Sequence, residues 1–198
     1  MTMHERPIRR IAIIGSSGAG KSTLSLVLGE ATGLPVVHLD KEYWLPGWVE
    51  PERAAWQARL AELAARPDWI IDGQYGASLT ERLARADLAI FLDLPTRVCL
   101  WRVVKRWWQL RGRVRPDMSE GCPEKIDLEF LHYVATFRLL QRPRIVAALE
   151  TSGVRTAWLR TIREQRAVGG MLRGQGLDAA VEAAPAWPQP SGFSSTTI

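Results

Sequence analysis

Short apolar runs alternate with two-sided stretches along this chain. The runs cover residues 11–14, 36–39, 69–71, 88–92 and 154–159. Runs of this length are typical of buried strands. Between them, apolar residues recur every three or four positions, as they do on helices with one buried face. Because strands that alternate with helices usually form parallel sheets, the pattern predicts a three-layer α/β fold with a mainly parallel sheet.

The predicted helices cover residues 24–31, 51–66, 78–86, 96–111, 124–149 and 161–173, with an interruption near Pro143. The stretch 96–111 has two clearly different sides. One side carries Leu100, Trp101, Val104, Trp107 and Trp108, and the other carries Arg102, Lys105 and Arg106. We expect the tryptophan side to be the buried face of this helix.

The last part of the chain differs in composition. From Gly174 onward it is rich in Gly, Ala, Pro, Ser and Thr. Such a composition buries little apolar surface, so it predicts a disordered tail over 174–198. The remaining residues, 1–173, are expected to form one domain.

A glycine-rich loop lies between the first predicted strand and the helix after it. Its residues are Gly15, Ser16, Ser17, Gly18, Ala19, Gly20, Lys21, Ser22 and Thr23. They match the phosphate-loop pattern of Gly, four free positions and Gly-Lys-Ser. Glycines let backbone N–H groups approach phosphate oxygens, and the helix N-terminus adds its positive dipole end. Lys21 would reach the β- and γ-phosphates and Ser22 would hold Mg²⁺, so the loop predicts binding of ATP and Mg²⁺.

A simpler interpretation of the loop is a glycine turn that caps a helix and leaves Lys21 in solvent. The strand and helix on either side favour the phosphate loop. The guanine-reading motif Asn-Lys-x-Asp is missing, which argues against a GTPase switch.

Composition limits the remaining possibilities. The 198 residues suit one domain, and the hydrophobic fraction of 46% is ordinary for a globular protein. The two cysteines make neither a disulfide framework nor a metal site, and no apolar run is long enough to cross a bilayer. A cytoplasmic location is therefore expected, without a membrane partner.

The net charge of +5 is unevenly distributed. Six basic residues and no acid lie between Arg102 and Arg115, and the rest of the chain carries −1. This segment could be a lid that closes over a triphosphate, a surface for nucleic acid, or a solvated face. Because the phosphate loop already implies a polyanionic ligand, the lid is favoured for Arg102 and Arg106.

Three aspartates, Asp40, Asp72 and Asp93, follow predicted strands. Ligands of open parallel sheets bind outside the carboxyl ends of the strands. Asp40 is the best candidate for a catalytic base or a magnesium contact, and Asp72 is a candidate for substrate contact. Asp93 resembles the second phosphate-site motif, although a structural turn before Pro95 explains it equally well.

Aromatic residues accompany two of these aspartates. Tyr43, Trp44 and Trp48 follow Asp40, and Tyr75 follows Asp72. They could sandwich a base or sugar, or they could pack a loop onto the sheet. His38 is expected to be a satisfied core residue, and none of the three histidines lies at metal-ligand spacing.

The chain resembles the adenylate-kinase-like phosphate-loop proteins known as DNA topology modulation (FlaR-like) proteins. The resemblance covers about residues 9–165. It is carried by 38–40, 43–48, 69–76, 115–118 and 121–125, in addition to the phosphate loop. One departure is Gln74, where the family usually has Asn.

This resemblance implies a nucleoside-monophosphate-kinase type of fold with strand order 2-3-1-4-5. It also implies that Arg102 and Arg106 flank adenine and the phosphates, and that a lid runs over about 111–123. Arg138 and Arg142 would reach the transferring phosphate. Monophosphate kinases carry a phosphate-binding arginine after the third strand, but Gln74 and Tyr75 follow here. At this point the chain is more similar to kinases that act on a hydroxyl, such as nucleoside kinases.

The sequence therefore predicts an ATP- and Mg²⁺-dependent phosphotransferase whose acceptor is a nucleotide, a nucleoside or another small hydroxyl compound. Lys21, Asp40, Arg106, Arg138 and Arg142 are the expected catalytic residues. Asp40 is expected to orient or deprotonate the acceptor. The alternative is a nucleotide-dependent DNA-binding regulatory protein with ATPase activity. No helix-turn-helix or zinc pattern supports that alternative.

Overall fold

A five-stranded parallel sheet forms the centre of the protein, which we describe from a computed structural model over residues 7–185. The strands are β1 (Arg10–Gly15), β2 (Val36–His38), β3 (Trp69–Asp72), β4 (Leu88–Leu92) and β5 (Thr156–Leu159). Their order is β2-β3-β1-β4-β5, so the predicted topology is confirmed. All pairs are parallel, and β1 lies between β3 and β4.

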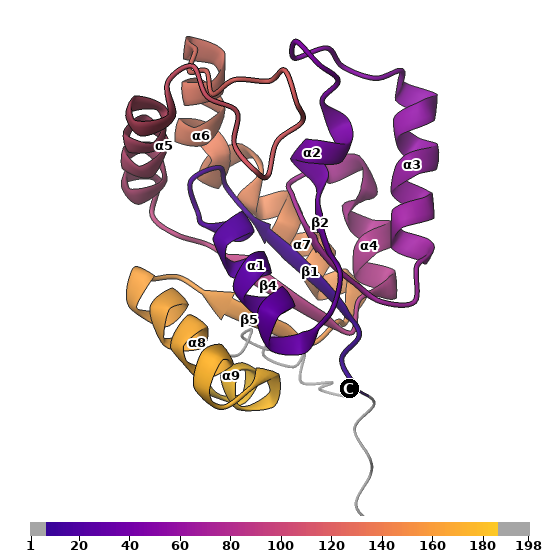
Figure 1. Ribbon diagram of the computed structural model, residues 1–198. Helices are drawn as coiled ribbons and strands as arrows, with labels where there is room; N and C mark the ends of the chain where they lie inside the picture. Colours follow the sequence, from indigo (N-terminus) through magenta and orange to yellow (C-terminus); the bar gives the residue numbers. More distant parts are fainter. Residues whose placement is uncertain (1–6, 186–198) are drawn as a thin grey trace, which may run out of the picture.

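Helices cover both faces of the sheet, giving the three expected layers (Figure 1). The helices of the first half are α1 (Lys21–Thr32), α2 (Leu39–Tyr43), α3 (Arg53–Ala65), the 3₁₀ helix η1 (Gly76–Ser78) and α4 (Leu79–Arg85). Those of the second half are α5 (Thr96–Leu110), α6 (Leu128–Leu140), α7 (Arg142–Ser152), α8 (Ile162–Gly174) and α9 (Leu177–Ala183). The predicted interruption near Pro143 is confirmed, because α6 ends one residue before Gln141 and α7 begins one residue after it.

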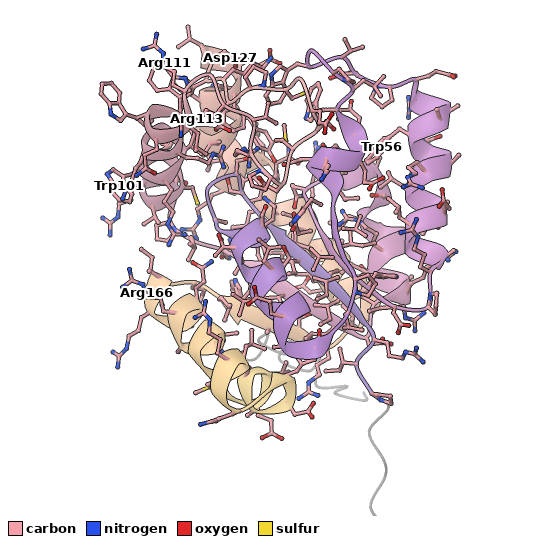
Figure 2. All side chains as sticks on the ribbon, in the orientation of Figure 1. Trp56, Trp101, Arg111, Arg113, Asp127 and Arg166 are labelled. Atoms are coloured by element: carbon pink, nitrogen blue, oxygen red, sulfur yellow. The ribbon has the colours of Figure 1, made fainter. Side chains whose placement is uncertain are left out.

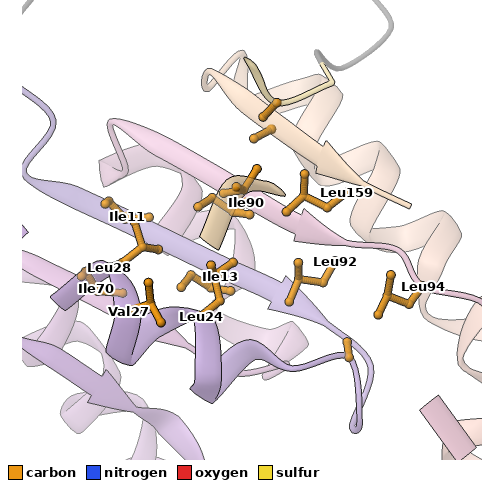
Figure 3. Packing of buried hydrophobic residues seen from close by; sticks show 14 of the residues in the cluster. Ile11, Ile13, Leu24, Val27, Leu28, Ile70, Ile90, Leu92, Leu94 and Leu159 are labelled. Atoms are coloured by element: carbon orange, nitrogen blue, oxygen red, sulfur yellow. The ribbon is translucent and has the colours of Figure 1, made fainter. Parts of the chain in front are cut away.

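Successive side chains of β1 point to opposite faces of the sheet, so the core forms two clusters. Ile11 and Ile13 pack with residues of α1, α8 and α9, whereas Ala12 and Ile14 pack with residues of α3, α4 and α7. Figure 3 shows the first of these clusters, in which Leu24 and Leu28 of α1 lie against Ile13 and Ile11. Because both faces of β1 are buried, its sequence is a continuous apolar run.

The strand register collects the polar strand ends at one edge of the sheet. Ile13 pairs with Asp72, His38 pairs with Asp72, and Gly15 pairs with Leu92. The phosphate loop, Asp40, the residues after β3 and Asp93 therefore all emerge at the same edge.

Helix α5 corrects one expectation. Trp101 and Trp108 are 62% and 75% exposed, and the fully buried residues of the helix are Cys99 and Val103. Arg102 and Arg106 share the inner side with these two, because positions spaced by three, four and seven lie on one face. Figure 2 shows Trp101 on the outer side of α5. The helical period identified two faces, but the neighbouring cavity decided which one turns inward.

The expected tail is also partly wrong. Residues 174–185 continue the domain, since Ala180 and Ala184 are buried in the first core cluster. The N–H of Trp158 donates to the carbonyl of Pro185 at 2.9 Å. Small alanines let α9 pack closely, so a composition poor in large apolar residues still forms a buried helix. Residues 186–198, the rest of the predicted tail, lie outside the described residues.

Within residues 7–185, no helix has both the length and the hydrophobicity needed to span a bilayer.

Asp87 ties the start of β1 to β4 from the edge opposite the site. Its carboxylate accepts the backbone N–H groups of Arg9 and Arg10 at 3.1 and 2.9 Å and the Arg10 guanidinium at 3.1 Å. Burial raises the pKa of Asp87, but the bonds from Arg10 and Arg9 outweigh it and hold the pKa below the usual 3.8.

We expect Asp87→Asn to lower the free energy of unfolding by about 1–2 kcal/mol at pH 7. A lowered native pKa stabilises the fold above the unfolded value, and this stabilisation is lost as the pH falls through the native value. The deficit of the variant should therefore shrink below about pH 4. Urea unfolding across pH measures it, with exposed Glu150→Gln as the control. A deficit that stays constant down to pH 2 would contradict this account.

Candidate functional site

A cavity of about 1210 Å³ opens at the carboxyl edge of the sheet. Its walls come from the phosphate loop, α5, the loop 111–127, the start of α6, α8, and the residues that follow β2 and β3. Parts of the chain up to 146 residues apart in sequence meet here, as when Gln165 donates to the carbonyl of Ala19 at 3.0 Å.

The phosphate loop has little space for side chains. Gly18 and Gly20 have φ angles of 79° and 95°. A Cβ at Gly18 would lie 2.4 Å from the carbonyl oxygen of Cys99, and one at Gly20 would lie 2.5 Å from Nε2 of Gln165. No side chain caps the N-terminus of α1, so its first N–H groups are open to an anion. Ser17, Gly18 and Gly20 through Thr23 line the cavity, while the buried Ser16 and Ala19 lie outside its lining.

Lys21 and Ser22 lie at the start of α1, and both line the cavity. The ammonium of Lys21 donates to the carbonyl of Ser16 at 3.2 Å, which curves its side chain back along the loop. Ser22 lines the cavity and contacts Asp117 of the loop 111–127. Burial raises the pKa of Asp117, but the charge of Arg115 and the bond from Ser22 outweigh it and lower the pKa overall.

Asp72 supports the site from beneath instead of lining it. Its Oδ2 accepts the hydroxyl of Ser25 at 2.5 Å and lies 2.6 Å from Nδ1 of His38. Burial lowers the pKa of His38, but the hydrogen bond and charge of Asp72 outweigh it and raise the pKa. The expectation that His38 is a satisfied residue is confirmed, whereas the expected substrate contact by Asp72 is not found.

Asp40 faces the cavity and is held by Tyr75. The Tyr75 hydroxyl donates to Oδ1 of Asp40 at 3.0 Å. Burial, together with the charge of Asp40, raises the pKa of Tyr75 far above its usual value, so the phenol keeps its proton. Trp44 and Tyr75 line the cavity, but Tyr43 does not, because its ring packs behind theirs at 4.9 and 5.0 Å between centroids.

The inner arginines of α5 reach the cavity, as predicted. Arg102 donates to the carbonyls of Gly18 and Ala19 at 3.4 and 3.1 Å and to Oε1 of Gln165 at 3.2 Å. Arg106 donates to Oε1 of Glu124 at 2.8 Å. Glu124 is buried and also lies 2.7 Å from Nε of Arg115, so one carboxylate ties α5 to the loop 111–127.

The loop predicted as a lid packs against α2 and the residues after it. The hydroxyl of Ser119 donates to the carbonyl of Lys41 at 2.6 Å, and the N–H of Gly47 donates to that of Gly121 at 3.0 Å. The indole N–H of Trp48 donates to the carbonyl of Pro123 at 3.1 Å. Figure 1 shows this loop beside α2, so it covers the cavity from that side. That it opens and closes stays a prediction.

Arg138 and Arg142 do not line the cavity. Nε of Arg142 donates to Oδ2 of Asp93 at 2.9 Å, and Nε of Arg138 lies 3.6 Å from Oδ1. The indole of Trp158 donates to the same Asp93, which is 3% exposed. These arginines therefore neutralise a buried carboxylate at the end of β4, which corrects their expected contact with a phosphate. Asp93 is correspondingly a structural residue.

Trp48, one of the aromatic residues noted after Asp40, lines the cavity. Several other lining residues carried no predicted role: Gln74, Asp117, Glu124, Tyr133, Gln165 and Arg166. Gln74, Asp117 and Glu124 belong to motifs noted in the sequence, which could have identified them. Gln165 and Arg166 follow the last strand in α8, and no local pattern distinguishes them (Figure 2).

The residues present fit a magnesium ion that is bound mainly through a nucleotide. Among the described residues, no group of three or more His, Cys, Asp or Glu side chains could hold a metal. Ser22 and Asp40 both line the cavity. Mg²⁺ is usually held by one or two protein ligands, together with phosphates and waters. The two side chains and a phosphate loop match that requirement.

The topology and the glycine loop define the class of the protein: it has the fold of the phosphate-loop kinases. Shikimate kinase from Acinetobacter baumannii, solved with shikimate, is 19% identical, with 88% of this chain and 90% of that one covered and a TM-score of 0.51. Shikimate kinase from Bacteroides thetaiotaomicron is also 19% identical, with coverage of 89% and 95% and a TM-score of 0.50.

Sequence comparison gives a shorter match. The uncharacterized protein YqaC of Bacillus subtilis (strain 168) is 32% identical over 108 residues, which cover 52% of this chain and 60% of YqaC. The match thus spans less than two thirds of that relative. No family model matches the chain.

Arg142 tests whether the Asp93 cluster is structural. We expect Arg142→Met to lower the free energy of unfolding by about 2–4 kcal/mol, because it leaves a buried carboxylate with a distant Arg138 and one indole. Urea unfolding measures this change, with exposed Arg144→Met on the same helix as the matched control. The ATP affinity of the folded variant should equal that of the wild type. Full stability combined with lost turnover would return Arg142 to the catalytic site.

Proposed function

We propose that the protein is an ATP- and Mg²⁺-dependent phosphotransferase that acts on a nucleotide, a nucleoside or another small hydroxyl compound. The observation that carries this proposal is the pairing of two sites in one cavity. The uncapped N-terminus of α1 with Lys21 forms one, and the carboxylate of Asp40 forms the other. A phosphate-loop kinase needs both, one for the phosphates and one for the acceptor hydroxyl.

The phosphate half works by electrostatics. N–H groups from residues 17–22 and the ammonium of Lys21 would surround the β- and γ-phosphates of ATP. Because these groups are fixed by the fold, they would stabilise transition-state charge without reorganisation. Arg102 and Arg106, on the inner side of α5, add positive charge next to the same loop.

Asp40 would act on the acceptor. A carboxylate that accepts the hydroxyl proton, or orients the hydroxyl, suits phosphoryl transfer. The hydrogen bond from Tyr75 fixes the orientation of Asp40 and leaves its second oxygen available to an acceptor. When bound, Mg²⁺ would supply charge neutralisation between the phosphates. Ser22 would hold it, and a magnesium contact by Asp40 is the alternative to its role as the base.

The loop 111–127 would shield the reaction from water. Its contacts with the residues after α2 close one side of the cavity. Excluding water strengthens the electrostatic interactions inside and prevents hydrolysis of ATP.

The resemblance to FlaR-like proteins and the alternative of a nucleotide-dependent DNA-binding protein stay predictions, as does a cytoplasmic location. The structure limits which cations could contact DNA phosphates. Arg115 already pairs with Asp117 and Glu124, whereas Arg111 and Arg113 are exposed. Phosphoryl transfer explains more of the site, because it uses both halves of the cavity.

Lys21→Ala tests the phosphate half. We expect ADP formation to fall by about 10²-fold or more, because one fixed positive charge at the phosphates is lost. The thermal unfolding midpoint should stay at the wild-type value. Lys105→Ala, an exposed cation on the outer side of α5, is the matched control and should retain full turnover. Wild-type turnover by Lys21→Ala would rule out this phosphate site.

Asp40→Asn tests the acceptor half. We expect transfer to fall by about 10²–10⁴-fold, because the amide cannot take the hydroxyl proton. ATP affinity measured by calorimetry should stay within about twofold of the wild type. If transfer and ATP affinity fall together, Asp40 is a metal contact or a structural residue and not the base.

A further inference from the structure

The acceptor half of the cavity is bounded by aromatic side chains. Trp44, Trp48 and Tyr75 line it. Tyr43 and Trp56 pack behind them. The ring centroid of Tyr43 lies 5.0 Å from that of Trp56 and 5.0 Å from that of Tyr75, and the centroids of Trp56 and Tyr75 lie 5.1 Å apart. Trp44 and Trp48 lie 5.3 Å apart. Rings braced in this way form rigid apolar walls, which suit a planar, ring-bearing ligand more than a flexible chain.

Charge in this half disfavours an anionic acceptor. The carboxylates of Asp40 and Glu50 line the cavity, and Asp117 lines it as the ion-pair partner of Arg115. Arg115 is neutralised by two acids, and the Lys125 ammonium at the rim lies 4.7 Å from the Trp48 ring centre. A second phosphate or a carboxylate on the acceptor would meet like charges here.

Arg82 is the arginine nearest in sequence to the loop after β3, and it is also unavailable. It is 1% exposed and donates to the carbonyls of Gly73 and Tyr75 and to the hydroxyl of Ser78, each at 3.2 Å. Burial lowers its pKa to about 10. Its guanidinium therefore shapes the loop that carries Gln74 and Tyr75 and does not line the cavity.

Gln74 has an unsatisfied group at the same place. Its Oε1 is buried without a hydrogen-bond partner among the described residues, although Gln74 lines the cavity. Leaving such a group unpaired costs about 1–3 kcal/mol. Rotation of the Gln74 amide toward the cavity would bring this oxygen to a ligand with a matching donor and recover that cost. A primary amide carries both an acceptor and a donor, and it pairs well with the neighbouring donor and acceptor of a nucleobase edge.

We propose that the acceptor is an uncharged nucleoside, whose base lies among Trp44, Trp48 and Tyr75 and is recognised by the Gln74 amide. This inference rests on the proposed phosphotransferase function. The nucleoside hydroxyl oxygen attacks the γ-phosphorus of ATP, and the bond from that phosphorus to the β,γ-bridging oxygen breaks. ADP leaves, and Asp40 takes the hydroxyl proton. The products are ADP and a nucleoside monophosphate.

The first experiment compares acceptors with the full-length protein and Mg·ATP. Ribo- and deoxyribonucleosides of each base are tested beside their monophosphates, shikimate and gluconate, and phosphorylated products are identified by mass spectrometry. We expect at least one nucleoside to be phosphorylated with kcat/KM at least about 10-fold above that of any anionic acceptor, a difference of about 1.4 kcal/mol. A nucleotide or a carboxylate as the best acceptor would overturn the nucleoside assignment and leave the kinase function intact.

Calorimetry distinguishes failure of the nucleoside assignment from failure of the phosphotransferase proposal. If ATP binds and no nucleoside is phosphorylated, the nucleoside assignment is wrong and the phosphate site stands. If ATP with Mg²⁺ gives no binding heat to the folded protein, the phosphotransferase proposal fails, and the nucleoside assignment fails with it.

The second experiment tests Gln74 as a specificity residue. In Gln74→Leu, KM for the preferred nucleoside should rise by about 10–100-fold, with KM for ATP unchanged. Gln74→Glu keeps the shape but loses the amide donor, and it should change the order of preference among bases. The exposed Gln109→Leu is the matched control. If both Gln74 variants fold and keep the wild-type KM and base preference, Gln74 does not read the acceptor. Binding of the unreacted nucleoside, followed by quenching of tryptophan fluorescence, gives the same test without turnover.

Discussion

The parallel pairing of β1 with β3 on one side and β4 on the other is the constraint on which the site depends. It buries both faces of β1 and brings its last residue, Gly15, to the carboxyl edge of the sheet. The chain must then turn sharply into α1, and Gly18 and Gly20 allow this turn with positive φ angles. The sheet therefore fixes the position of the uncapped N–H groups that result.

Around this fixed loop, the rest of the cavity is assembled from elements that hold one another by ion pairs and hydrogen bonds. Glu124 joins α5 to the loop 111–127, that loop binds α2, and Gln165 joins α8 to the phosphate loop. Buried carboxylates with paired arginines are costly to break, so they set the positions of these elements. The Asp93 cluster likewise joins α6 and α7 to the ends of β4 and β5. Positive charge is therefore divided between arginines that face the cavity and arginines that hold the walls.

The two halves of the cavity differ in chemistry. Backbone N–H groups and cations form the phosphate half, and carboxylates with aromatic rings form the acceptor half. The charged triphosphate and the uncharged, ring-shaped acceptor that we propose would complement these halves. In a kinase, this division would keep the acceptor out of the phosphate half and orient its hydroxyl toward Asp40.

Local sequence by itself determined the strands, their parallel arrangement through the alternation with helices, and the phosphate loop. Each of these depends on residues that are neighbours in the chain. It also named Asp40, Trp44, Tyr75, Arg102 and Arg106 as site residues, and all of them line the cavity.

Only the tertiary structure decided which side of α5 turns inward, because Arg102 and Arg106 find polar partners there while Trp101 and Trp108 stay in solvent. The same holds for Arg138 and Arg142, whose partner Asp93 lies at least 45 residues away, and for α9, whose small alanines are buried by contacts that composition does not reveal. Residues distant in sequence decide which side chains are buried and which ion pairs form, since the charge or size of a side chain does not specify its contacts in the fold.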